Sequence, residues 1–140
     1  MRLASCALAV VAFALVLGAC GESSEDKAKS TVCDARDDIG KQVDALKSLT
    51  PATVTTDAVT QHVTAIKDDL QDIAGAQSDL SGDRRSEVES ATKTFTNSVQ
   101  TIASDVLRSL SAADAKTALT TAAQQLQASY QKTLAPLDCG

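Results

Sequence analysis

Few side chains in this sequence can carry chemistry, and its cysteines are the first candidates. The chain of 140 residues has four of them, Cys6, Cys20, Cys33 and Cys139, and a single histidine, His62. A thiol can be acylated, oxidised to a disulfide, bound to a metal ion or used as a nucleophile. A metal site needs further ligands, and a catalytic thiol needs a neighbouring base, so both explanations are weak here.

Cys20 ends a segment that is typical of an export signal. A positively charged start precedes an apolar run over residues 3–17, which is shorter than the roughly 20 residues of a membrane span. The run ends in Leu17-Gly18-Ala19-Cys20, which resembles the bacterial lipobox, whose cysteine receives a diacylglycerol before cleavage. We predict a signal peptide over residues 1–19 and lipidation of Cys20. An ordinary secretion signal with a chance cysteine and a retained N-terminal span are the alternatives.

In an exported chain, the two remaining cysteines lie in an oxidising compartment. Cys6 leaves with the signal peptide and Cys20 carries lipid, so Cys33 and Cys139 are left in an exported chain. Exported thiols commonly pair. We therefore predict a disulfide between Cys33 and Cys139, which closes nearly the whole mature chain into one loop.

Charge and composition argue against several classes of partner. Loss of Arg2 lowers the 13 basic residues to 12 against 18 acidic residues, so the net charge goes from −5 to −6. An acidic chain is repelled by nucleic acid and by anionic lipid. Only Phe95 and Tyr130 are aromatic after the signal peptide, which leaves little on which bases or sugars can stack. We expect no nucleic-acid partner.

The remaining polar candidates fit a solvated surface. His62 falls on the shoulder of an apolar helical stripe, and Asp69 lies about 10 Å further along the same helix, too far to pair with it. Three acidic residues project opposite the stripe, without the looped geometry of a calcium site: Asp68, Asp72 and Asp79. We predict no catalytic residues, no metal site and no cofactor.

Two further sets of residues are expected to be structural. Hydroxyl side chains gather on the third and fourth apolar-periodic segments, where we expect them to form polar surface; O-glycosylation or hydrogen bonds to cell-wall polymers are the alternatives. These residues are Thr92, Thr94, Thr96, Ser98, Thr117, Thr120 and Thr121. Gly40 and Gly75 fall off the apolar stripes, and we interpret both as tolerated costs within helices.

Four segments have the spacing of apolar residues that predicts helices. They are residues 32–49, 57–80, 84–109 and 112–134. The first has apolar positions at intervals of three and four residues: Val32, Ala35, Ile39, Val43 and Leu46. The polar, charged residues before it predict a flexible tether over 20–30, with a reach of at most about 35 Å.

Local signals mark the ends of these helices. Thr50-Pro51 stops the first, because the residue before proline is pushed out of the helical region. Ser81-Gly82-Asp83 combines a C-terminal glycine with a capping aspartate before the third helix. Residues 111–114 resemble a capping box for the fourth. The first helix is then the shortest.

The predicted disulfide decides the number of helices. Short connections make neighbouring helices antiparallel, so with an even number the chain ends meet at one end of the bundle. With three helices Cys33 and Cys139 would lie a helix length apart. We therefore predict an all-α, antiparallel up-down four-helix bundle over residues 31–140, closed by an N- to C-terminal disulfide.

The lipobox, the polar segment after it, "TVCDARDDI" and the terminal "APLDCG" together resemble small uncharacterised Ala- and Thr-rich helical lipoproteins of high-GC Gram-positive bacteria. The resemblance implies a lipid-anchored protein on the extracytoplasmic face of the cell membrane, and no activity. We expect a non-catalytic interaction or structural module. Its partners are the bilayer, through diacylglycerol on Cys20, and an envelope protein of unknown identity. The alternative is a binder of a small ligand in a groove between helices.

Overall fold

The described part of the chain is helical. The computed structural model describes residues 23–50, 52–109 and 115–139. It contains helices α1 (Ser24–Lys47), α2 (Thr56–Ala76), α3 (Gly82–Ser109) and α4 (Ala115–Thr133), with a 3₁₀ turn, η1 (Gln77–Asp79), after α2. The expected signal peptide, Cys20 and the expected cap at residues 111–114 lie outside the described residues.

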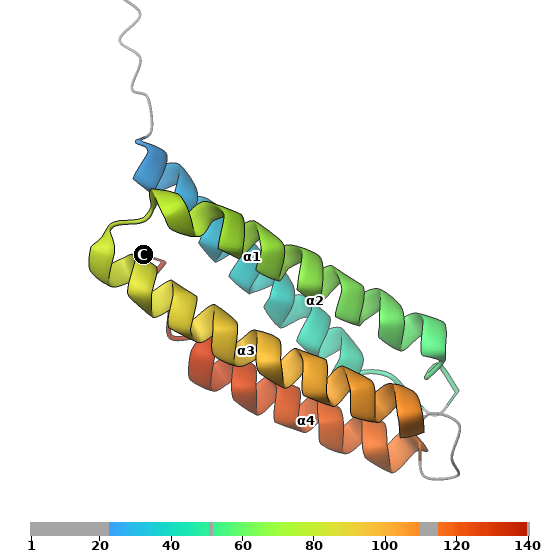
Figure 1. The fold of residues 1–140 in the computed structure, drawn as a ribbon. Helices are drawn as coiled ribbons and strands as arrows, with labels where there is room; N and C mark the ends of the chain where they lie inside the picture. Colours follow the sequence, from blue (N-terminus) through green and yellow to red (C-terminus); the bar gives the residue numbers. More distant parts are fainter. Residues whose placement is uncertain (1–22, 51, 110–114, 140) are drawn as a thin grey trace, which may run out of the picture.

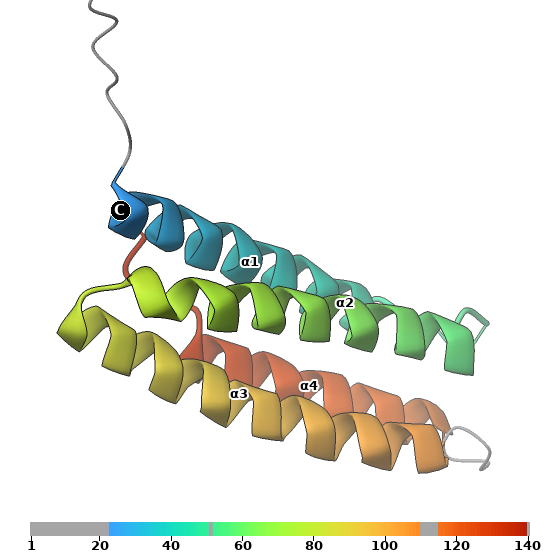
Figure 2. The same ribbon diagram turned by 45° about the horizontal axis from the view of Figure 1, so that its top comes forward.

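The helices pack as two antiparallel hairpins, α1–α2 and α3–α4 (Figures 1 and 2). Helix α1 contacts α2 and α4, and α3 contacts α2 and α4, whereas the diagonal pairs among these described helices stay apart. The two helices of each hairpin contact each other more extensively than they contact the helices of the other hairpin. This arrangement confirms the predicted antiparallel four-helix bundle.

Helix α1 begins earlier than predicted, so the prediction of a flexible tether is wrong for residues 24–30. The Ser23 hydroxyl accepts a hydrogen bond from the Asp26 backbone N–H at 3.1 Å, and the Asp26 carboxylate accepts one from the Ser23 N–H at 3.4 Å. This capping box satisfies N–H groups that a helix start otherwise leaves free. Ala28 is buried in the added turns. Helix α1 is therefore not the shortest helix.

The turn between α2 and α3 is stabilised differently from the predicted cap. Helix α3 begins at Gly82, which places Asp83 inside its first turn. The Arg85 guanidinium donates to the carbonyl oxygens of Gln77, Ser78 and Leu80 at 3.1, 2.6 and 3.0 Å. One arginine thus binds three carbonyl groups at the end of the helix, where such groups commonly lack intrahelical partners; the Gln77 carbonyl also accepts from the Leu80 N–H at 3.2 Å.

The core follows the predicted apolar stripes. Every helix contributes, and Phe95 and Ile39 are fully buried. Thr92 is the one polar residue among the buried described residues, so its prediction as surface is wrong. It lies four residues after Val88 and three before Phe95, which puts it on the buried stripe. Its hydroxyl oxygen has no hydrogen-bond partner among the described residues.

The Cys33–Cys139 disulfide is present and joins α1 to the segment after α4. The two Cα atoms lie 5.7 Å apart, across 106 positions of sequence. We call this the disulfide end of the bundle; the turn from α2 to α3 lies at the same end (Figure 1). The opposite, distal end holds the α1–α2 connection, the end of α3 and the start of α4.

Removing the bridge should destabilise the bundle strongly. For the Cys33→Ser, Cys139→Ser double variant we expect the free energy of unfolding to fall by up to about 4.7 kcal/mol, because the unfolded chain regains the entropy of a loop of about 100 residues. Urea unfolding followed by circular dichroism measures the change. The parent chain with its bridge intact is the control. A fall below about 1 kcal/mol would contradict a stabilising role for the bridge.

Candidate functional site

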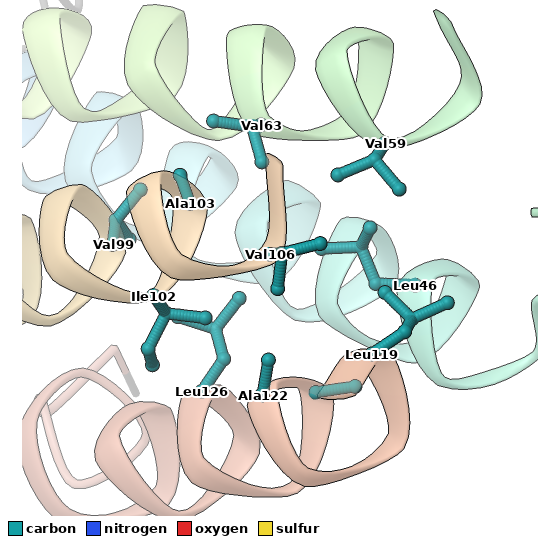
Figure 3. A pocket seen from close by; sticks show the side chains of 11 residues that line it. Leu46, Val59, Val63, Val99, Ile102, Ala103, Val106, Leu119, Ala122 and Leu126 are labelled. Carbon is teal, nitrogen blue, oxygen red and sulfur yellow. The ribbon is translucent and has the colours of Figure 1, made fainter. Parts of the chain in front are cut away.

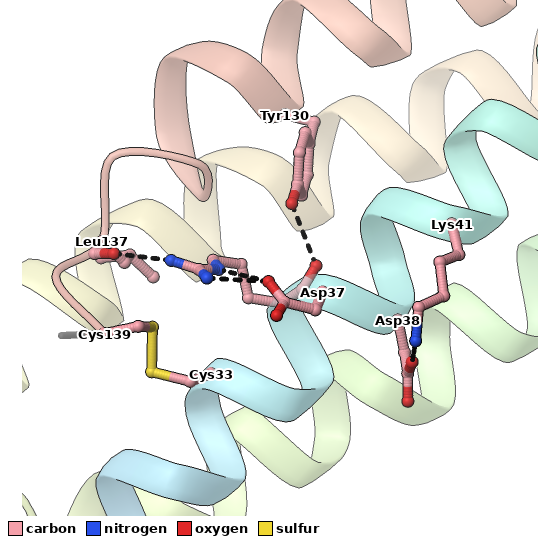
Figure 4. Close-up of polar contacts among 8 residues, drawn as sticks. Cys33, Asp37, Asp38, Lys41, Tyr130, Leu137 and Cys139 are labelled. Carbon is pink, nitrogen blue, oxygen red and sulfur yellow. Dashed lines mark hydrogen bonds and ion pairs between the residues drawn. A yellow bond between two sulfur atoms is a disulfide. The ribbon is translucent and has the colours of Figure 1, made fainter.

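The disulfide end carries a cluster of polar contacts that fixes the C-terminal segment. The Tyr130 hydroxyl donates to the backbone carbonyl of Arg36 at 3.2 Å. The Arg36 guanidinium donates to the carbonyl of Leu137 at 2.8 Å and pairs with Asp37 at 2.7 Å (Figure 4). Residues from α1, α4 and the C-terminal segment therefore meet beside the disulfide.

A second arginine holds the same segment from α3. Arg84 donates to the carbonyl oxygen of Asp138 at 2.5 Å and contacts its carboxylate at 3.3 Å. Charge-assisted hydrogen bonds of this kind are stronger than neutral ones. Arg36 thus binds the carbonyl of Leu137, the last buried residue among those described, and Arg84 binds the next residue, Asp138.

Gly40 is required by Tyr130, which corrects its interpretation as a tolerated cost. A Cβ atom at Gly40 would lie 2.8 Å from the Tyr130 hydroxyl oxygen and 3.1 Å from Cζ. The tyrosine ring also packs edge-on against Phe95, with 6.2 Å between ring centroids. Burial raises the pKa of Tyr130. Nothing lies within 4 Å of a Cβ at Gly75, as expected for a tolerated glycine.

His62, the single histidine, lies on α2 and faces α1. Its Nδ1 atom is 2.7 Å from the amide oxygen of Gln42, and the contact is half-buried. The histidine therefore pairs with a neutral amide. Among the residues that the structure describes, no group of three or more His, Cys, Asp or Glu side chains is placed to hold a metal ion.

Three acidic residues of α2 and η1 lie at the surface, as the sequence predicted. Asp68, Asp72 and Asp79 are exposed. Asp69 is half-buried, and its burial, with the nearby charges of Asp38 and Asp72, raises the pKa of its carboxyl. Asp38 itself pairs with Lys41 at 2.6 Å.

An apolar cavity lies at the distal end, where all four helices meet (Figure 3). Its volume is about 20 Å³, slightly above the roughly 10–15 Å³ that one water molecule needs. Its lining is aliphatic throughout and includes Leu46, Val63, Val106, Leu119, Ala122 and Leu126. The spacing of apolar residues predicted a helix in each of the four segments but could not show that the side chains of these helices fit together incompletely.

The outer surface of the described residues is polar. Leu107 is the one large hydrophobic side chain that is exposed there, at 42%. None of the described helices combines the length and the apolarity needed to cross a membrane.

Comparisons with protein-family models, curated proteins and solved structures found no match to this chain. The case for its function therefore depends on its own residues.

The Gly40–Tyr130 contact can be tested by paired substitutions. We expect Gly40→Ala to lower the free energy of unfolding by about 1–3 kcal/mol, the usual range for overpacking. Gly75→Ala, the matched control, should raise it by about 0.5–1 kcal/mol because alanine favours the helix. Combining Gly40→Ala with Tyr130→Phe, which removes the clashing oxygen, should recover part of the loss. Urea unfolding measures all three. Equal effects of both glycine substitutions would contradict the contact.

Proposed function

We propose that this chain is a lipid-anchored protein of the bacterial cell envelope, on the extracytoplasmic face of the cell membrane. The sequence Leu17-Gly18-Ala19-Cys20 is the observation that carries the proposal, because it has the residue types of a lipobox. Two acyl chains on Cys20 anchor a protein stably, since each buried methylene contributes about 0.8 kcal/mol. The helical bundle then acts as a non-catalytic interaction or structural module.

The disulfide supports an exported location. The sulfurs of Cys33 and Cys139 are bonded to each other, and such bonds persist in oxidising compartments and are rare in the bacterial cytoplasm. A structural bridge between the two ends of the fold suits a protein that works outside the cell.

The start of α1 brings the proposed anchor close to the bundle. Helix α1 begins at Ser24, four positions after Cys20, and four residues of chain span at most about 14 Å. An anchor on Cys20 therefore holds the disulfide end near the bilayer, and the distal end points away from it. The net charge of −6 that the chain carries after loss of the signal peptide gives it no electrostatic attraction of its own to anionic lipid.

The contacts made by the candidate reactive side chains support a non-catalytic role. Cys33 and Cys139 are joined to each other, so neither presents a thiol. His62 contacts the Gln42 amide, and neither bridged cysteine is free to act as the nucleophile that a histidine base would activate.

Lipidation is tested by a matched pair of cysteine substitutions in a bacterial host. We expect Cys20→Ala to move the protein from the membrane fraction to the soluble fraction, because the acyl acceptor is lost. Cys6→Ala, within the same N-terminal segment, should leave the protein in the membrane. Intact mass should show a diacyl or triacyl adduct only when Cys20 is present. A Cys20→Ala chain that stays membrane-bound would contradict the anchor.

The interaction role is tested by crosslinking in intact cells. A photoreactive residue is placed at Gln61 on α2 or at Asn97 on α3, which are exposed positions on the two hairpins. We expect a reproducible crosslinked protein from the anchored chain and its loss in Cys20→Ala, because the anchor brings the module to its envelope partner. Identical crosslinking by the Cys20→Ala chain would show that contact with the partner does not depend on the anchor. The absence of a crosslink at both positions would contradict the interaction role.

A further inference from the structure

The two hairpins are joined covalently at one end only. The turn through η1 connects α2 to α3, and the Cys33–Cys139 bridge connects α1 to the segment after α4. Both links lie at the disulfide end (Figures 1 and 2). At the distal end each chain connection stays within its own hairpin, from α1 to α2 and from α3 to α4.

Polar contacts reinforce the same end. Arg36 donates to Leu137 and Tyr130 donates to Arg36, which ties α1 to α4 and the C-terminal segment. Arg85 of α3 donates to the carbonyl of Gln77 after α2. Each of these hydrogen bonds crosses from one hairpin to the other within the half of the bundle that contains the disulfide. These links hold the two hairpins together at the disulfide end, which we call the hinge.

The larger apolar cavity lies at the opposite end, at about 20 Å³ against about 10 Å³ for a void beside the disulfide. The apolar cavity is lined by side chains from both hairpins, such as Val63 of α2, Val106 of α3 and Ala122 of α4 (Figure 3). Small side chains are part of its lining, including Ala103 and Ala122, so fewer dispersion contacts hold the hairpins together there. A hinge at the disulfide end and weak packing at the distal end together favour separation of the hairpins at the distal end.

We propose that the hairpins part at the distal end and that the cavity between them binds a linear alkyl chain, as in a fatty acid. This activity goes beyond the proposed anchoring role and does not depend on it. The lining offers carbon atoms and no polar partner, so the polar head of such a ligand stays outside. A slender, flexible chain needs the least widening of a cavity of about 20 Å³, whereas a ring system needs more.

Binding is tested with the fluorescent fatty acid cis-parinaric acid. The protein is the exported full-length chain with Cys20→Ser, so that no covalent lipid competes and a failure of the anchor does not affect the result. We expect saturable binding that dodecanoic acid displaces. Ala122→Leu, which fills the cavity, should weaken binding by roughly tenfold or more.

The matched control is Ala128→Leu, an exposed position on the same helix, which should bind as the parent chain does. Ala103→Val, a smaller filling substitution, is the second variant if Ala122→Leu does not fold by circular dichroism. Absence of binding by the parent chain, or equal binding by the filled and control variants, would overturn the proposal.

Opening is tested by distances between spin labels in the same Cys20→Ser chain. Labels at Thr60 and Ser104 report on the distal end of α2 and α3, and labels at Gln71 and Glu89 report on the disulfide end; all four positions are exposed. Dodecanoic acid should lengthen the distal distance and leave the other unchanged. An unchanged distal distance with bound ligand, or equal lengthening at both ends, would overturn the hinge.

Discussion

The Cys33–Cys139 bridge is the constraint on which the arrangement of this bundle depends. It brings the segment after α4 against α1. In an up-and-down bundle this segment can reach α1 only if the number of helices is even, and the described bundle has four. Arg36 and Arg84 then hold the segment through Leu137 and Asp138. The bridge acts on the unfolded state by restricting the chain, while the arginine contacts act on the folded state, so the two contributions are complementary.

Packing is uneven along the bundle axis, and this unevenness has a simple origin. Toward the disulfide end, Phe95, Tyr130 and Gly40 fit closely, since the glycine leaves the space that the tyrosine hydroxyl occupies. At the distal end, alanine and valine side chains line a cavity instead. A core built from small residues fills space only where a larger residue from a neighbouring helix reaches into it.

The proposed anchor and the proposed ligand site lie at opposite ends of the molecule. With α1 beginning at Ser24, an anchor on Cys20 holds the covalently closed end near the membrane. The end that lacks a covalent link between the hairpins then points away from it. The same covalent topology therefore separates a mechanically fixed attachment from a deformable apolar site, without any further element.

The sequence by itself determined the helical class, most of the core and the disulfide. Helical periodicity is a local property, and elimination among four cysteines left a single pair. The sequence did not indicate the first turns of α1, because Ala28 is a single small residue in a charged segment. Ala28 becomes buried only where α1 lies against the end of α2 and η1. The sequence also did not reveal the role of Gly40, whose partner Tyr130 lies on another helix. The cavity was decided by tertiary structure alone, since it depends on how side chains from four helices fit together, and no one helix contains that information.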